Sequence, residues 1–172
     1  MQNRWLFAAL LWVATLWVGP ARAVEGIYVG GEVGYTEVTG RIRGFSNAIG
    51  FGVDLGVRSN ALLDVIFHLQ ASSHSAAGDL SIYSQALSAQ VHWAQVNDFD
   101  FILGAGPGFY FFKTATQTNT AFGVNALTGV DVKVDDALRV GLLWRYNLVL
   151  GTAGDNTWQA MMKVGYWFDL GP

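Results

Sequence analysis

Residues 158–170, with the sequence WQAMMKVGYWFDL, decide the fold of this chain. The even positions are all apolar or aromatic, and they are Trp158, Ala160, Met162, Val164, Tyr166, Phe168 and Leu170. The odd positions hold the amide, both charges and the glycine, and they are Gln159, Met161, Lys163, Gly165, Trp167 and Asp169. A repeat of two residues is that of a β-strand whose two faces differ. The stretch therefore predicts a strand with one continuous apolar face and one mostly polar face.

The same alternation runs through the chain from residue 27 onward. It predicts eight strands, at residues 27–36, 49–58, 62–70, 83–93, 99–112, 122–133, 138–148 and 158–170. Within these ranges every charged residue and histidine shares one phase, and nearly all Val, Leu and Phe share the other. Gln85 is an outward exception in its strand.

Two features indicate that the polar phase points inward. It is rich in glycine, which suits a narrow interior, and aromatic residues of the apolar phase gather near strand ends, as in the girdles of membrane barrels. Trp144 and Tyr146 lie further along their strand and fit the girdles less well. We therefore predict an all-β fold, an eight-stranded antiparallel up-and-down transmembrane β-barrel that spans residues 24–172.

The N-terminus predicts export. Arg4 precedes an apolar run at residues 5–18, and the small-x-small sequence at residues 21–23 predicts a signal peptide, residues 1–23, cleaved after Ala23. Loss of Arg4 and Arg22 leaves eight of the ten basic residues against 13 acidic ones. The mature chain has no basic run, so we expect no nucleic-acid partner. It has no cysteine, so disulfides and thiolate metal sites are excluded.

The connections alternate between long and short, which is typical of a barrel with both mature termini in the periplasm. Pro107 lies within the predicted strand 99–112, where it removes a hydrogen-bond donor, and a β-bulge is expected there.

These features resemble the small outer-membrane barrels typified by OmpX and the membrane domain of OmpA. The most specific part is the last strand, which is similar to the barrel-assembly signal. The four defined positions of that signal are matched by Lys163, Gly165, Phe168 and Leu170, although Gly171 and Pro172 follow in place of a terminal aromatic residue. The resemblance implies insertion by the barrel-assembly machinery into a bacterial outer membrane, contact with its lipid and lipopolysaccharide, and a monomer.

Inward charges in so narrow a barrel must be paired. Hairpin register predicts that Arg139 has Asp131 and Asp169 as neighbours, and that Arg145 lies opposite Lys163. Closure of the barrel brings Glu32 towards Lys163, with Asp54 beside Glu32. The predicted interior ionic network therefore comprises Glu32, Asp54, Asp131, Arg139, Arg145, Lys163 and Asp169.

Other chemistry is less favoured. Ser84, His68 and Asp64 share the inward phase, but they point away from the lipid that a lipid A-modifying hydrolase must reach. His68 and His92 lie near different strand ends and His74 lies in a predicted loop, so we expect no metal and no other cofactor.

Arg41 and Arg43 in the first long loop are candidate contacts for lipopolysaccharide phosphates. The sequence thus favours an integral outer-membrane barrel without enzymatic activity, with a role in envelope structure or surface interaction. A narrow porin-like channel for small solutes or ions is the first alternative, because inward glycines leave room in the lumen. A lipid A-modifying hydrolase is the second.

Overall fold

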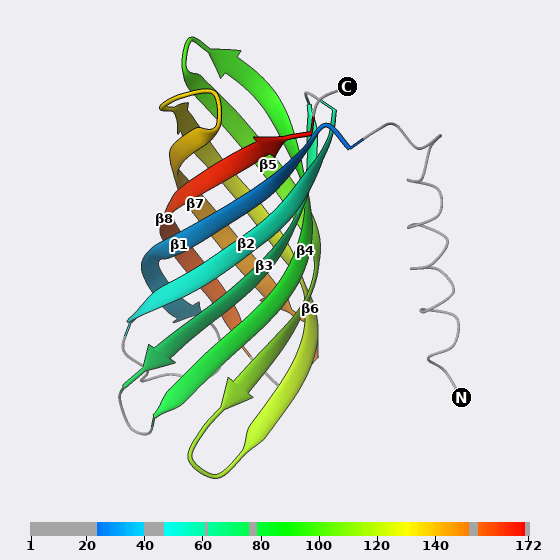
Figure 1. Cartoon of the computed structure of the whole chain (residues 1–172). Coiled ribbons are helices and arrows are strands. Elements are labelled where there is room, and N and C mark those ends of the chain that lie inside the picture. The colour runs from blue at the N-terminus through cyan, green and yellow to red at the C-terminus, as the bar shows by residue number, and fades with distance from the viewer. Residues whose placement is uncertain (1–23, 40–46, 61, 76–78, 152–154, 171–172) are drawn as a thin grey trace, which may run out of the picture.

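The chain folds into a closed barrel of eight antiparallel strands, in which each strand pairs with its neighbour in sequence and β8 pairs with β1 (Figure 1). The computed structural model describes residues 24–39, 47–60, 62–75, 79–151 and 155–170. The strands are β1 (Gly26–Thr39), β2 (Ala48–Asn60), β3 (Leu63–His74), β4 (Leu80–Val96), β5 (Phe99–Lys113), β6 (Thr118–Lys133), β7 (Leu138–Val149) and β8 (Asn156–Asp169). The predicted fold class and strand number are confirmed.

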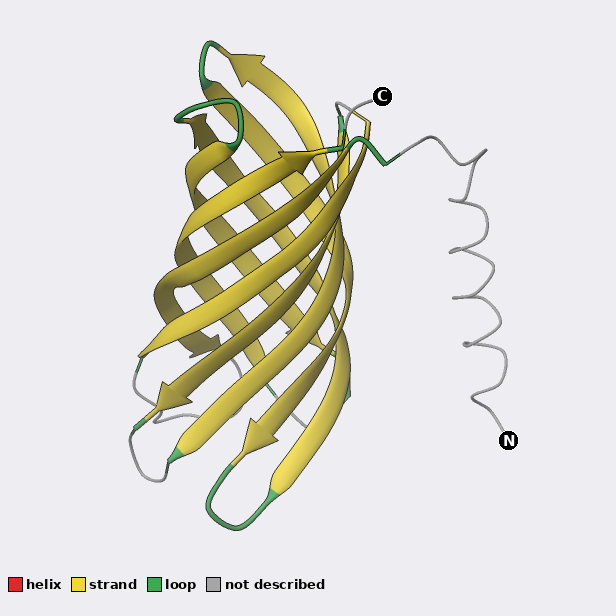
Figure 2. Cartoon of the chain, viewed as in Figure 1, coloured by secondary structure: helices red, strands yellow, loops and turns green. Residues whose placement is uncertain are grey.

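The described residues between the strands form turns and loops (Figure 2). Across the described ranges, no helix has the length and apolar character needed to cross a membrane. The predicted signal peptide, residues 1–23, lies outside the described residues.

The two ends of the barrel differ. Both described chain ends lie at the upper end in Figure 1, together with the β2–β3, β4–β5 and β6–β7 turns, and we call this the termini end. The β6–β7 turn is held by Asp135, whose carboxylate accepts hydrogen bonds from the backbone N–H groups of Leu138 (2.7 Å) and Ala137 (2.8 Å). These two bonds hold the pKa of the Asp135 carboxyl below its usual range. The opposite end carries the remaining connections, and we call it the loop end.

The apolar phase faces outward and the polar phase faces the lumen, as the sequence predicts. In β8, Met162 and Val164 are exposed on the outside, whereas Met161 and Lys163 are only 2% and 5% exposed. The strands extend further towards the loop end than the alternation indicates. His74, predicted to lie in a loop, is the last residue of β3 and is buried, with Nε2 3.0 Å from Ser72 Oγ.

The bulge expected at Pro107 is absent from the described ladder. The register of β4 with β5 is the same on both sides of Pro107, and Pro107 lies opposite Val124 of β6. The register instead shifts between His92 and Ala94, which places the irregularity at Trp93 near the termini end. A proline removes one donor, but it forces no extra residue into a strand whose neighbours keep their spacing.

Apolar side chains fill three zones of the interior. The cluster nearest the loop end comprises Leu80, Ile82, Tyr110, Phe112, Ala121 and Val149. Further into the barrel lies a cluster of Ile102, Leu127, Leu143 and Met161. The third cluster, towards the termini end, is formed by Tyr28, Ile66 and Trp167. The lumen therefore contains packed apolar layers as well as polar groups.

Neighbouring side chains occupy the space beside several inward glycines, which were expected to leave room in the lumen. A Cβ on Gly30 or Gly165 would overlap the ring of Tyr28, and a Cβ on Gly123 would lie 2.9 Å from the Tyr110 ring. At these three positions the space left by the missing side chain is occupied by an aromatic ring. These glycines therefore do not leave the room in the lumen that the channel alternative assumed.

Two adjacent glycines of β1 provide a test of this packing. Gly30→Ala is expected to lower the free energy of unfolding by about 1–3 kcal/mol, because the new methyl group displaces the Tyr28 ring from beside Trp167. Gly31 faces outward, with its nearest neighbour 3.9 Å from a built Cβ, so Gly31→Ala should change stability by less than about 0.5 kcal/mol. Reversible urea unfolding in vesicles measures both values. Equal costs would contradict the packing of Tyr28 over Gly30.

Candidate functional site

The candidate site is the polar interior, where ionisable side chains from all eight strands meet in three groups. The first, which we call the central cluster, consists of Glu32, Asp54, His68 and Arg145, each at most 4% exposed. The second is the pair Lys163–Asp131. The third, which we call the terminal chain, consists of Arg58, Asp64, His92, Asp100 and Arg139 near the termini end.

Arg145 of β7 and Glu32 of β1 form the core of the central cluster. Arg145 donates from Nη1 to Glu32 Oε2 and from Nη2 to Glu32 Oε1, both at 3.1 Å, in a two-pronged ion pair. β8 lies between β7 and β1, so this pair joins two strands that are not neighbours in the barrel. A guanidinium matches a carboxylate in this geometry better than an ammonium group does.

His68 completes the central cluster. Its Nδ1 lies 2.6 Å from Asp54 Oδ1 and 3.0 Å from Arg145 Nη2, which joins the two acids and the arginine in one group. The side-chain nitrogen of Gln90 lies 3.3 Å from His68 Nε2. His68 Nε2 can accept from Gln90, whereas Nδ1 can either donate to Asp54 or accept from Arg145, but not both.

Two of the polar contacts are made across a glycine. Asp131, Gly141 and Lys163 lie in one row on β6, β7 and β8, and Lys163 Nζ reaches Asp131 Oδ2 at 2.9 Å. Gln70, Gly52 and Glu32 form an equivalent row on β3, β2 and β1. There the Gln70 side-chain nitrogen donates to Glu32 Oε2 at 2.6 Å. Since the middle residue has no side chain, partners two strands apart come into contact.

The terminal chain alternates in charge. Arg58 binds Asp64 through Nε at 2.9 Å, and Arg139 Nη1 donates to Asp100 Oδ2 at 2.7 Å. His92 lies between the two acids, with each ring nitrogen 2.6 Å from a carboxylate oxygen. Since a carboxylate only accepts, both ring nitrogens must donate, and His92 is an imidazolium in this arrangement.

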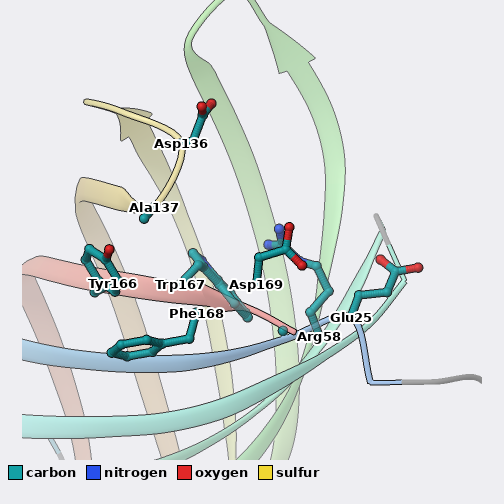
Figure 3. Close-up of a pocket in the computed structure, with 9 residues that line it drawn as sticks. Glu25, Arg58, Asp136, Ala137, Tyr166, Trp167, Phe168 and Asp169 are labelled. Carbon is teal, nitrogen blue, oxygen red and sulfur yellow. The ribbon is translucent and has the colours of Figure 1, made fainter. Parts of the chain in front are cut away.

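A pocket of about 710 Å³ lies at the rim of the termini end, beside the terminal chain (Figure 3). It is lined by Glu25, Gly26, Arg58, Asp136, Ala137, Tyr166, Trp167, Phe168 and Asp169. The Arg58 guanidinium stacks on the Trp167 ring, 4.1 Å from its centre. This stacking helps to cover the lumen on the side of the pocket.

The ion pairs in the structure therefore differ from those of the predicted network. Asp131 pairs with Lys163, and Arg139 pairs with Asp100, which the predicted network omitted. The expected neighbour of Arg139, Asp169, lies opposite Gly26, and Arg139 lies opposite Gly165. Asp169 instead lines the rim pocket.

The expected facing of Arg145 and Lys163 is also wrong, because Arg145 lies opposite Gln159 and Lys163 opposite Gly141. The loop between β7 and β8 sets a register about four residues away from the assumed one.

Several residues of these ionic groups were not predicted to belong to the interior network. His68 was considered for catalysis and for a metal site, and His92 for a metal site, but neither was placed in the ionic network. Asp64 and Arg58 share that inward phase, and the β2–β3 register sets them opposite each other, a pairing that a hairpin argument could have found. The contacts of His92 with Asp64 and Asp100 join three strands, and no local sequence pattern indicates them.

The candidate catalytic triad is not assembled. Ser84 donates to Gln70 Oε1 at 3.4 Å, His68 contacts Asp54, and Asp64 contacts Arg58 and His92. Ser84, His68 and Asp64 therefore have separate partners. Catalysis of the serine–histidine type requires a hydrogen bond between the serine hydroxyl and the histidine base, which this arrangement does not provide.

Glu32, Asp54 and His68 could in principle hold a metal ion, since one ligand atom of each lies within 4.8 Å of the others. The positive charge that these acids require is already supplied by Arg145, whose guanidinium contacts both Glu32 and His68. A cation at this position would have to displace the guanidinium. The donor set fits an internal ion pair better than a metal centre.

The residues of the assembly-signal resemblance lie on both faces of β8. Lys163 and Gly165 face the lumen, whereas Phe168 faces outward and Leu170, just beyond the strand, is exposed. Arg41 and Arg43, the candidate contacts for lipopolysaccharide, lie outside the described residues.

Comparison with solved structures gives the same fold. Neisserial surface protein A matches with a TM-score of 0.69 at 16% identity, over 83% of this chain and 96% of that one. OprG from Pseudomonas aeruginosa matches with a TM-score of 0.58 at 13% identity, over 85% and 97%. The outer membrane protein W of E. coli matches with a TM-score of 0.54 at 18% identity, over 86% and 99%.

No curated protein sequence matches the chain. Residues 6–168, however, match the family described as outer membrane protein beta-barrel domain, which covers most of the chain. The exposed apolar belt and the buried charges agree with that match. The chain belongs to the outer membrane protein beta-barrel domain family, and it is an integral β-barrel protein of the bacterial outer membrane whose outer face contacts membrane lipid.

Proposed function

We propose that this barrel is a closed, non-enzymatic anchor that stabilises the envelope and presents its loops at the cell surface. The observation that carries the proposal is the filled interior. The central cluster, the terminal chain and three apolar clusters occupy successive zones of the lumen. Eight strands enclose a space that side chains can fill, and here they do so.

The loop end supports a role in surface presentation. The hairpin of β5 and β6 reaches furthest at this end (Figure 1). Its tip is polar and exposed, with Thr114 and Gln117 bonded to each other through N–H of Thr114 and the Gln117 carbonyl at 2.8 Å. A short polar tip of this kind is suited to contact with other molecules outside the membrane.

The remaining assignments complete this proposal. Residues 1–23 are a cleaved signal peptide, both mature termini lie in the periplasm, and the protein is a monomer. Lys163, Gly165, Phe168 and Leu170 form the signal read by the barrel-assembly machinery. Arg41 and Arg43 contact lipopolysaccharide phosphates, for which two arginines near a membrane surface are suitable donors.

The closed lumen is tested by electrical recording. Purified protein inserted into a planar lipid bilayer is expected to give no steady single-channel conductance, because ion pairs and apolar layers block the pathway. Slower gel migration after boiling verifies that the inserted protein is a folded barrel. Steady openings of folded protein would contradict the proposal and favour the narrow channel.

A further inference from the structure

One outward-facing residue of the barrel wall is polar. Gln85 of β4 faces outward and is exposed, between Leu69 of β3 and Phe109 of β5. Within the described parts of the chain, no hydrogen bond is made by its side chain. An amide carries two donors and an acceptor, and leaving them unpaired in hydrocarbon is unfavourable.

A groove of about 360 Å³ opens beside Gln85. Its shape follows from the sizes of three residues in one row: Phe51 on β2, Ala71 on β3 and Tyr83 on β4. The small Ala71 leaves a depression between two aromatic rings. Gln85 follows Tyr83 on the same face and borders the groove.

A second groove provides a comparison within the same molecule. It has a volume of about 290 Å³ and is lined on the outside by Ala126, Thr128, Trp144, Tyr146 and other apolar residues. The Thr128 hydroxyl in this groove donates to the backbone carbonyl of Ile102 at 3.2 Å. The two grooves thus differ in one respect that bears on recognition, because only the groove at Gln85 is bordered by an outward-facing amide side chain.

We propose that the Gln85 groove binds an acyl chain that carries an amide linkage or a hydroxyl group near its carbonyl end. The chain would lie over Ala71 between Phe51 and Tyr83, and its amide or hydroxyl would bond the Gln85 side chain. Chains of this kind are those of N-acylated glycolipids in the outer leaflet. The inference rests on the proposed orientation, which puts the loop end of β4, and therefore Gln85, on the outer-leaflet side.

The occupant follows from the position of the groove. Family membership places this face against membrane lipid, so acyl chains are the molecules that reach it. A plain hydrocarbon chain fills the depression but leaves the amide unpaired. A chain with its own amide or hydroxyl group satisfies both the shape and the hydrogen bond.

Native mass spectrometry of the purified full-length barrel in detergent micelles, titrated with lipid A, tests the proposal. Gln85→Leu is expected to weaken lipid A binding about fivefold, as for the loss of one hydrogen bond within a membrane. Thr128→Val, in the comparison groove, should leave binding unchanged. Phosphatidylethanolamine, whose chains lack the amide and the hydroxyl, should bind wild type and Gln85→Leu equally.

A second pair of variants tests the shape. Ala71→Phe fills the depression and should abolish the lipid A preference, whereas Ala126→Phe in the comparison groove should not. Gel migration before and after boiling verifies that each variant folds. Lipid reaches both ends of a barrel in a micelle, so the result depends neither on orientation nor on conductance.

Three outcomes would overturn the proposal. Gln85→Leu could bind lipid A as tightly as wild type, or it could lose both lipids equally, which would remove the role of the amide. The wild type could also form a dimer that Gln85→Leu dissociates, which would make a second copy the occupant of the groove.

Discussion

Replacement of Arg145 by Met is expected to lower the free energy of unfolding by about 3–5 kcal/mol. The substitution keeps most of the side-chain volume but removes the guanidinium that bonds Glu32 and contacts His68. Glu32 would then remain buried with the Gln70 amide as its close partner. A buried carboxylate without a counter-charge is strongly unfavourable. Reversible urea unfolding of the protein in lipid vesicles measures the change.

Two controls accompany this measurement. Lys133→Met removes the ion pair with Asp136 at the exposed turn, and it should cost less than about 1 kcal/mol. The double variant Glu32→Gln, Arg145→Met should be less destabilised than the sum of the single changes, because neither charge is then left alone. A cost of Arg145→Met similar to that of Lys133→Met would show that the central cluster is not a closed ion pair.

Replacement of Leu142 by Arg is expected to cost about 2–4 kcal/mol, since a charge then faces hydrocarbon in the middle of β7. Leu142 is exposed on the outer face between Val130 of β6 and Met162 of β8. The same vesicle unfolding measurement gives the value.

Val134→Arg provides the matched control. Val134 is exposed in the turn between β6 and β7, and an arginine there should cost about 0–1 kcal/mol. If Leu142→Arg were tolerated as well as Val134→Arg, the outer face of β7 would not contact lipid.

The sequence was sufficient to predict the number of strands and the face on which each residue lies. Both follow from local alternation, because a strand places successive side chains on opposite faces whatever its neighbours are. Met162 and Lys163 illustrate this, since one is exposed and the other buried as their positions predict.

The ionic partners could not be predicted in the same way. Arg145 binds Glu32 from a strand that is adjacent neither in sequence nor in the sheet. Such a contact depends on the stagger of the closed barrel and on its width, which hairpin register does not contain. The assumed β7–β8 register also misplaced Asp169, because the loop that sets it has no distinctive turn motif.

The inward glycines show a second limit of prediction from the sequence. Gly141 and Gly52 looked like empty space, but each lies between two polar residues that meet over it. Gly30 and Gly165 likewise accommodate the Tyr28 ring. Whether a missing side chain leaves a void depends on the neighbours two strands away, which a single strand does not reveal.

The central claim is that lipid contacts the apolar phase while the opposite phase lines a sealed interior. Methyl NMR of the wild-type protein in lipid nanodiscs tests this at two neighbouring residues, Leu142 and Leu143, of which Leu143 is only 1% exposed. Dissolved oxygen, which concentrates in hydrocarbon, should relax the Leu142 methyl groups strongly and those of Leu143 weakly. Leu143 should also show no exchange contact with water. Strong oxygen relaxation at Leu143, or water contact at its methyl groups, would contradict the sealed and inward-facing interior.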